Sequence, residues 1–172
     1  NMRLLAVEAE VPRMVLGRAV LGMRSLDAAL DLLRRAPASG GFHFGLTHVA
    51  DRRIMSVEFG GGETSIVEIT QAAVHANHAL HQKRGISGQI ITASSQDRQT
   101  RGAALLASGQ RDPLAILRDK SGAGLPIRRD APDDPDDENT LATAILHVTD
   151  EGIEWSIHDK DAGVTAYAGR AA

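Results

Sequence analysis

The sequence predicts an α+β domain built from layered antiparallel sheets, and three observations support this class. Helical and strand-like patterns occupy separate blocks along the 172 residues, in the order helices, strands, helices, strands. The first strand block holds three short runs joined by tight turns, which favours antiparallel pairing over βαβ crossovers. The content of 42% apolar and 24% charged residues is typical of a globular protein. The length predicts one domain over residues 1–172, or the larger part of one.

The first block is helical after a short opening segment. Residues 2–9 are compatible with a strand. Pro12 suits the start of a first helix, because its fixed φ is preorganised for the first turn. Ser25 is a favourable N-cap for a second, amphipathic helix whose leucines repeat at three- and four-residue intervals up to Arg35. The Pro- and Gly-rich segment 37–41 ends the block.

The second block is predicted to be a three-stranded antiparallel sheet. Its strands are expected over residues 42–48, 54–59 and 65–70. Asp51–Arg53 forms the first connecting turn. The run Gly60–Gly62 forms the second, since no Lys-Ser/Thr pair follows it to make a phosphate-binding loop.

The third block is again helical. Ser94 or Ser95 is expected to cap a helix that continues to about Ala107. Asp112 and Pro113 are a cap and a first-turn proline, and they open a shorter helix that ends near residue 118.

The final block follows an acidic, turn-rich segment. Residues 130–138 are expected to form an exposed acidic loop, and they lack the glycine and spacing of a calcium-binding EF-hand. Residues 140–148 and 152–158 are predicted to form a terminal β-hairpin.

Composition excludes several classes of function. A net charge of −3 and only three Phe, one Tyr and one Trp argue against nucleic-acid binding. No apolar stretch approaches the about 20 residues that span a bilayer, and no signal peptide is evident, so we expect no membrane association and a cytoplasmic protein. The absence of Cys excludes disulfides, thiolate metal sites and a cysteine nucleophile within these residues.

The most informative cluster is His75-Ala76-Asn77-His78, which follows a strand-like run. An uncharged amide such as that of Asn77 can donate a hydrogen bond to the oxyanion of an acyl-transfer reaction. The alternative is an ordinary strand-to-loop turn, where Asn is common. His75, His78 and His81 recur every three residues, but the third drifts off a helical face and no carboxylate is near in sequence. We therefore expect no metal and no cofactor here, and roles for these histidines in core contacts or in hydrogen bonds that hold the Asn77 loop.

Three arginines and one glutamate complete the set of candidate residues. Arg18 occurs in an apolar helix, where a buried arginine needs an anionic partner, and Glu58 at the end of a strand is the candidate. Arg98 and Arg101 are one helical turn apart and could bind a substrate carboxylate, although a solvated helix face is the more common role for such a pair.

The order of these features resembles the acyl-coenzyme A:6-aminopenicillanic acid acyltransferase family of N-terminal-nucleophile hydrolases. Members carry an arginine-containing helix, an amphipathic helix, a hairpin ending in Glu, a His-Thr-Asn-His motif, a Ser-Ser-x-x-Arg helix and a late Thr-Leu-Ala-Ser strand. The corresponding segments are Leu16–Leu21, Leu26–Leu30, Ala50–Glu58, His75–His78, Ser94–Arg98 and Thr140–Thr143.

The resemblance implies a four-layer αββα fold, made by autocatalytic cleavage of a precursor. A freed N-terminal cysteine would attack an amide or acyl-thioester substrate, such as an acyl-CoA, with its own α-amino group as the base. Asn77 would be the oxyanion donor. His75, His78 and Glu58 would shape or bind in the substrate pocket, and Arg18 would orient the catalytic groups.

The sequence departs from the family pattern in two places. It has no cysteine, and the family's Ile-Cys-Arg step is Ile127-Arg128-Arg129 here. Our preferred interpretation is the C-terminal part of such an acyltransferase or amidohydrolase, completed by a companion N-terminal segment or subunit that holds the nucleophile. The alternative is a catalytically inactive α+β domain that binds a partner or a small ligand, so whether this chain alone is an enzyme stays open.

Overall fold

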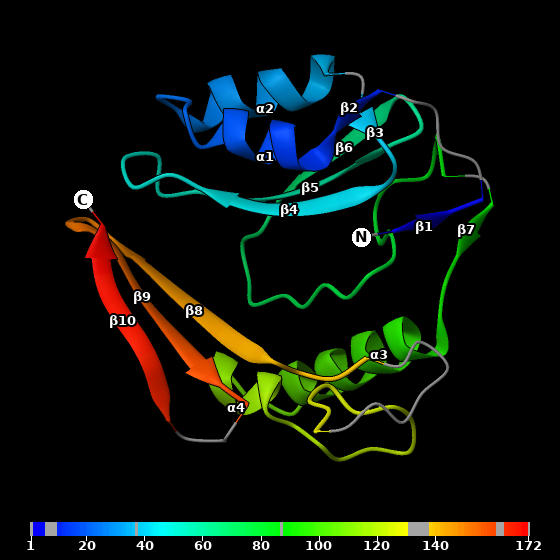
Figure 1. Cartoon of the computed structure of the whole chain (residues 1–172), viewed down its shortest axis with the longest axis vertical. Helices are drawn as coiled ribbons and strands as arrows, with labels where there is room; N and C mark the ends of the chain where they lie inside the picture. The colour runs from blue at the N-terminus through cyan, green and yellow to red at the C-terminus, as the bar shows by residue number, and fades with distance from the viewer. Residues whose placement is uncertain are drawn as a thin grey trace. The chain divides into compact units, whose positions relative to one another are not determined.

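The chain folds into helices and antiparallel sheets, which confirms the α+β class. The computed structural model describes residues 2–5, 10–36, 38–86, 88–130, 138–160 and 164–171 (Figure 1). These residues divide into two compact units. Unit 1 comprises Asn1–Gln71 and Asn77–Ile91, and unit 2 comprises Ala72–Ala76 and Thr92–Ala172.

Unit 1 has a three-stranded antiparallel sheet in the order β4-β5-β6, as predicted. Its central strand β5 pairs with both neighbours, and two short pairs, β1 with β7 and β2 with β3, flank the sheet. The elements of unit 1 are β1 (Arg3–Leu4), β2 (Val11–Pro12), α1 (Arg13–Val20), α2 (Leu26–Arg35), β3 (Ala38–Ser39), β4 (Phe42–Thr47), β5 (Ile54–Gly60), β6 (Glu63–Glu68) and β7 (Gln89–Ile90).

The two helices of unit 1 begin where the sequence predicts. Pro12 is the N-cap of α1, and the Ser25 side chain accepts a hydrogen bond from the Ala28 N–H at 3.2 Å at the start of α2. The opening strand is shorter than expected. Only Arg3–Leu4 are a strand, and residues 6–9 lie outside the described part of the chain.

The core of unit 1 lies between these helices and one face of the sheet (Figure 1). Alternate residues of a strand point to opposite faces, so Met55, Val57 and Phe59 of β5 share the face that packs beneath the helices. Val57 is 0% and Phe59 1% exposed, and the Phe44 and Phe59 ring centroids are 5.1 Å apart in an edge-on contact. The opposite face of β5 carries Ser56 and Glu58.

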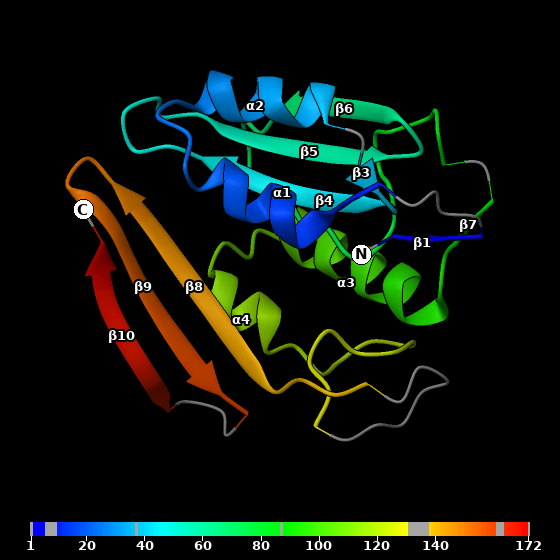
Figure 2. The same cartoon turned by 45° about the horizontal axis from the view of Figure 1, so that its top comes forward.

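Unit 2 has a second antiparallel sheet, in the order β10-β9-β8 (Figure 2). The terminal hairpin is confirmed, but the third strand β10 was not predicted. The elements of unit 2 are α3 (Ala93–Ala107), α4 (Pro113–Leu117), β8 (Ala142–Thr149), β9 (Gly152–Asp159) and β10 (Thr165–Ala171).

The capping of the unit 2 helices is partly as expected. The Asp112 side chain caps α4 by accepting from the Leu114 N–H at 2.9 Å. The predicted cap of α3 is wrong, because Thr92 is the N-cap and accepts from the Ser95 N–H at 3.2 Å. Ser94 and Ser95 lie inside the first turn and are each 2% exposed. Most of the predicted acidic loop, residues 131–137, lies outside the described residues.

The sheet of unit 2 carries a buried polar pair on one face and exposed apolar side chains on the other. Thr143 of β8 pairs with His158 of β9, and both are 9% exposed. The other face carries Leu146, opposite Trp155, and Tyr167, opposite Ile157; Leu146 is 65% and Tyr167 69% exposed. No helix among the described residues is long and apolar enough to cross a membrane.

Candidate functional site

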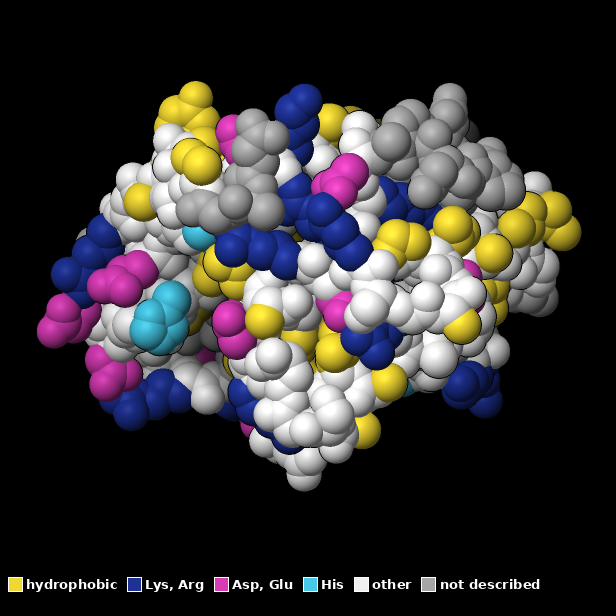
Figure 3. Space-filling model, turned by 90° about the horizontal axis from the view of Figure 1, so that it is seen from below, with side chains coloured by type: hydrophobic (Ala, Val, Ile, Leu, Met, Phe, Trp, Pro, Cys, Tyr) yellow, Lys and Arg dark blue, Asp and Glu magenta, His cyan; other side chains and the backbone are white. Residues whose placement is uncertain are grey.

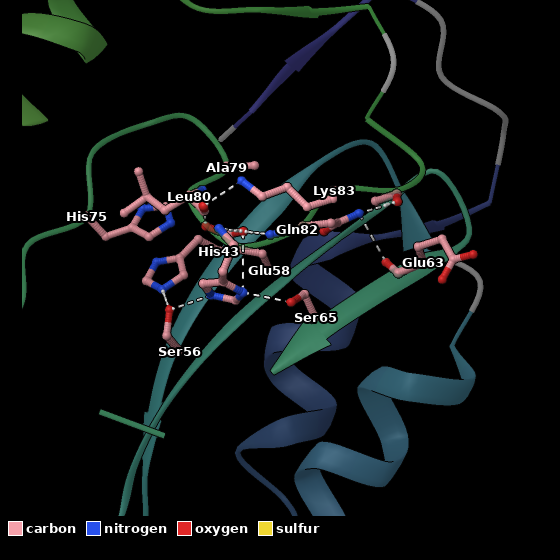
Figure 4. Close-up of polar contacts among 12 residues, drawn as sticks. His43, Ser56, Glu58, Glu63, Ser65, His75, Ala79, Leu80, Gln82 and Lys83 are labelled. Carbon is pink, nitrogen blue, oxygen red and sulfur yellow. Dashed lines mark hydrogen bonds and ion pairs between the residues drawn. The ribbon is translucent and has the colours of Figure 1, made fainter. Parts of the chain in front are cut away.

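The polar face of the unit 1 sheet gathers the chemically active side chains of that unit (Figure 4). The strand register places His43 of β4, Glu58 of β5 and Ser65 of β6 directly opposite one another. Ser56, two residues before Glu58, shares their face and lies opposite Gly45, which has no side chain to fill the space. The loop from Asn77 to Ile86 supplies the groups that contact this row.

Glu58 is the centre of the site. Its side chain is fully buried, at 0% exposure. The Leu80 N–H donates to Oε1 at 2.6 Å, while the N–H groups of His81 and Gln82 donate to Oε2 at 2.9 and 2.6 Å. Three backbone donors on one carboxylate offset the large desolvation cost of burying it. Since this stretch belongs to no helix or strand, Glu58 also satisfies backbone groups that secondary structure would otherwise satisfy.

The His81 ring links the loop to two strands. Its Nε2 is 3.0 Å from the Ser56 hydroxyl, and its Nδ1 is 2.8 Å from the Ser65 hydroxyl. The Ser56 hydroxyl is also 2.9 Å from Nε2 of His43. The Nδ1 atom of His81 lies 3.6 Å from Oε2 of Glu58, which makes an ion pair when the ring is protonated. The expectation that a histidine of this cluster holds the loop by hydrogen bonds is therefore confirmed for His81.

Gln82 and two glycines fix the other end of the loop. The buried Gln82 side-chain amide donates to the carbonyl oxygens of Gly60 and Arg84 at 2.9 and 2.8 Å. Gly61 adopts φ +59, and a Cβ there would lie 1.9 Å from the Gly85 carbonyl oxygen. The backbones of the β5–β6 turn and the loop thus approach so closely that glycine is required at position 61.

The sequence-predicted residues of the His-Ala-Asn-His motif fall in both units. Asn77 lies exposed on the irregular part of unit 1, and the next residue, His78, is 6% exposed. His75 belongs to unit 2, where its Nδ1–H donates to the Ala76 carbonyl oxygen at 2.8 Å. The side chain of Gln99 on α3 holds this segment by accepting from the Ala76 N–H and donating to the Val74 carbonyl, at 2.8 and 3.1 Å.

The predicted pairing of Arg18 with Glu58 is wrong. Arg18 is exposed on α1, and α1 packs over the apolar face of the sheet. Glu58 points from the opposite face, where its carboxylate contacts the loop. Two side chains on opposite faces of one sheet cannot form an ion pair, so Arg18 has no part in holding Glu58.

Unit 2 contains a separate ion pair on α3. Nε and a terminal nitrogen of Arg101 each donate to Asp119 at 2.8 Å. These hydrogen bonds are the main reason that the pKa of the Asp119 carboxyl falls from 3.8 to about 2. Arg101 is therefore engaged within the chain, which disfavours a role in binding a substrate carboxylate.

Basic, acidic and apolar side chains are interspersed over the face shown in Figure 3, which is the pattern of an ordinary solvated surface.

The arrangement provides fixed hydrogen-bond donors and a buried carboxylate, without a thiol. Within the described part of the chain, no group of three or more His, Cys, Asp or Glu side chains is placed to hold a metal ion. Sequence reasoning missed His43, Ser56, Ser65 and Gln82. The signal for Ser56 was present, because a polar residue two positions before Glu58 in a strand must share its face.

The chain matches a known protein-family model. The family model described as acyl-coenzyme A:6-aminopenicillanic acid acyl-transferase matches residues 2–162. No curated protein and no solved structure matches the chain.

Proposed function

This chain belongs to the acyl-coenzyme A:6-aminopenicillanic acid acyl-transferase family, and we propose that it carries the C-terminal part of an acyltransferase or amidohydrolase. The substrate is an amide or an acyl thioester of the acyl-CoA type, and water or an amine accepts the acyl group. The printed sequence contains no cysteine, so the attacking thiol comes from a companion segment or subunit outside it. A reducing compartment such as the cytoplasm, where a catalytic thiol persists, is part of this proposal.

The observation that carries the proposal is the anchored loop behind Asn77. Attack on an acyl carbon creates an oxyanion, which needs preorganised hydrogen-bond donors. Asn77 is exposed and therefore accessible to a substrate, while the residues that follow it are held by a buried carboxylate. An amide on such a support can donate to the developing charge with little reorganisation. In this role Asn77 is the oxyanion donor, and the buried His78 shapes the pocket.

The helices and sheets of the two units support the four-layer αββα architecture, which is part of this proposal. Each unit has one three-stranded antiparallel sheet and two helices, which is the material that an αββα fold requires. The sheet of unit 2 leaves an apolar face exposed at Leu146 and Tyr167. Exposed apolar patches mark interaction surfaces, and in this proposal strands of the companion segment pack on this one.

The test uses the complete coding sequence, with any region encoded before Asn1 retained. The purified product is assayed for thiol release from an acyl-CoA and for hydrolysis of the corresponding amide. Asn77→Ala is compared with Asn139→Ala, which removes an exposed asparagine of unit 2. Losing one oxyanion donor lowers kcat by about 10²–10³-fold, so we expect that loss in the first variant and unchanged activity in the second. A wild-type kcat in Asn77→Ala would overturn the assigned role.

The second candidate is an inactive α+β domain that binds a partner or a small ligand. The observation in its favour is the absence of cysteine from the 172 residues. It predicts that the complete product shows no thioester or amide cleavage, and that the chain unfolds in one cooperative transition as a monomer. Activity that iodoacetamide abolishes would reject this candidate, because alkylation identifies a required thiol.

A further inference from the structure

The stability of the sheet does not explain why a charged residue is buried at position 58. A buried carboxylate costs free energy unless it is fully hydrogen-bonded, and apolar residues of similar volume often replace such groups without loss of stability. Glu58 is nevertheless buried at the middle of the sheet, with three consecutive N–H groups of the loop on its two oxygens. The carboxylate therefore acts mainly on the loop and contributes little to the core.

We propose that Glu58 is a positioning residue that holds the Asn77 loop in its working geometry, and that both carboxylate oxygens are required for this. The inference rests on the function proposed above. It assigns Glu58 no contact with substrate, and its action passes through the backbone of residues 80–82.

Asn77 lies close along the chain to the three N–H groups that Glu58 binds, so a change at these groups can affect Asn77 directly. Only His78 and Ala79 separate Asn77 from Leu80, whose N–H is the first of the three that donate to Glu58. His78 is 6% exposed, and the Ala79 N–H donates to the Gln89 side-chain oxygen at 3.2 Å. Since only these two residues intervene, a displacement of residues 80–82 shifts the backbone from which Asn77 extends.

Other contacts of the loop attach it to the strands of the sheet. The His81 ring is hydrogen-bonded to β5 and β6 through Ser56 and Ser65. The Gln82 amide is bound to the Gly60 carbonyl at the end of β5. These side-chain contacts surround the Glu58 carboxylate, which itself binds the loop backbone at three successive positions (Figure 4).

Two substitutions separate the charge of Glu58 from its shape. In Glu58→Gln, an NH₂ group replaces one acceptor and faces a backbone N–H. If the amide oxygen takes the Oε2 position, the Leu80 N–H loses its acceptor; in the opposite orientation, the His81 and Gln82 N–H groups lose theirs. Glu58→Asp keeps two acceptors but shortens the side chain by one methylene. Glu63→Gln is the matched control, since it removes an exposed carboxylate from the same hairpin.

The first measurement is amide hydrogen exchange of the full chain by NMR. In Glu58→Gln, we expect exchange at one or two of residues 80–82 to accelerate roughly 10-fold or more, while Val57 and Phe59 change little. Glu58→Asp should lie between this variant and the wild type, and Glu63→Gln should match the wild type. If Glu58→Gln does not fold, Glu58→Asp provides the comparison. Wild-type exchange at residues 80–82 in the folded Glu58 variants would overturn the proposal.

The second measurement is kinetic and uses the complete enzyme. Glu58→Gln should lower kcat by roughly 10-fold or more with KM nearly unchanged, because an oxyanion donor acts in the transition state. Glu58→Asp should restore part of kcat, a rescue that a purely structural role does not predict. Equal kcat values in Glu58→Gln and Glu63→Gln would overturn the positioning role. If the complete protein has no acyl-transfer activity, the proposed function fails, and the exchange measurement still decides whether Glu58 holds the loop.

Discussion

Replacing Gly61 by alanine tests the close approach that fixes the end of the Asn77 loop. Gly61 has φ +59, and an alanine in this left-handed conformation costs about 1–2 kcal/mol. Its Cβ would also lie 1.9 Å from the oxygen and 2.6 Å from the carbon of the Gly85 carbonyl. These are backbone atoms, so relief requires a shift of the loop, and overpacking of this kind costs about 1–3 kcal/mol. The two terms together predict a destabilisation of about 2–5 kcal/mol.

The neighbouring Gly62 provides a matched control. It has φ +76, but its added Cβ meets nothing within 4 Å, so Gly62→Ala carries only the conformational term of about 1–2 kcal/mol. Urea unfolding followed by NMR at the amides of Val57 and Phe59 measures both variants on the sheet of unit 1. Gly61→Ala should be the less stable of the two by about 1–3 kcal/mol. Equal stabilities within about 0.5 kcal/mol would refute the contact with Gly85.

Three further changes test the packing, capping and electrostatics. Leu33→Ala, at a residue 1% exposed, should cost about 2–5 kcal/mol in urea unfolding, whereas Met14→Ala, at a residue 73% exposed, should stay within about 0.5 kcal/mol. Ser25→Ala should cost about 0.5–2 kcal/mol in the same assay, because the Ala28 N–H loses its cap. Arg101→Ala should raise the pKa of Asp119 from about 2 towards 3.8 in an NMR titration. Because folding lowers that pKa, the Arg101 interaction stabilises the chain fully above pH 3.8, and this stabilisation is lost as the pH falls through 2. If Arg101→Ala and the wild type lose stability with falling pH in the same way, the interaction is contradicted.

Local signals in the sequence were sufficient for most elements of the fold. The leucine spacing and Ser25 cap predict α2, and the run Ile54–Phe59 predicts the central strand. The strand β10 was missed because residues 165–171 are rich in alanine and glycine, which carry little strand signal. The cap of α3 was misassigned because three hydroxyl residues lie within four positions, and only the backbone conformation of Thr92 decides among them.

The site was less predictable, because it depends on strand register and on which face a helix covers. Glu58 could be identified as a candidate, but its partners are backbone groups of a distant loop that carry no side-chain signature. Arg18 was misinterpreted for a related reason. The apolar neighbours in its helix suggested burial, yet Leu16 alone of α1 is fully buried, and Arg18 lies on the exposed side. The spacing of apolar residues shows that a helix has a buried face. Which residues lie on that face depends on how the helix packs against the sheet.

The two faces of the unit 1 sheet have opposite roles, and the difference bears on function. Phe59 and Val57 pack beneath the helices and supply the stability of the unit. Glu58, between them in sequence, points to the other side and binds a loop that contains no helix or strand. A buried polar row is a poor source of stability compared with an apolar one. Polar residues that are buried without a gain in stability are expected where a protein holds a functional segment in place. On this argument, the polar row is retained for the geometry of the loop, and Asn77 is the accessible amide in that loop that the geometry would serve.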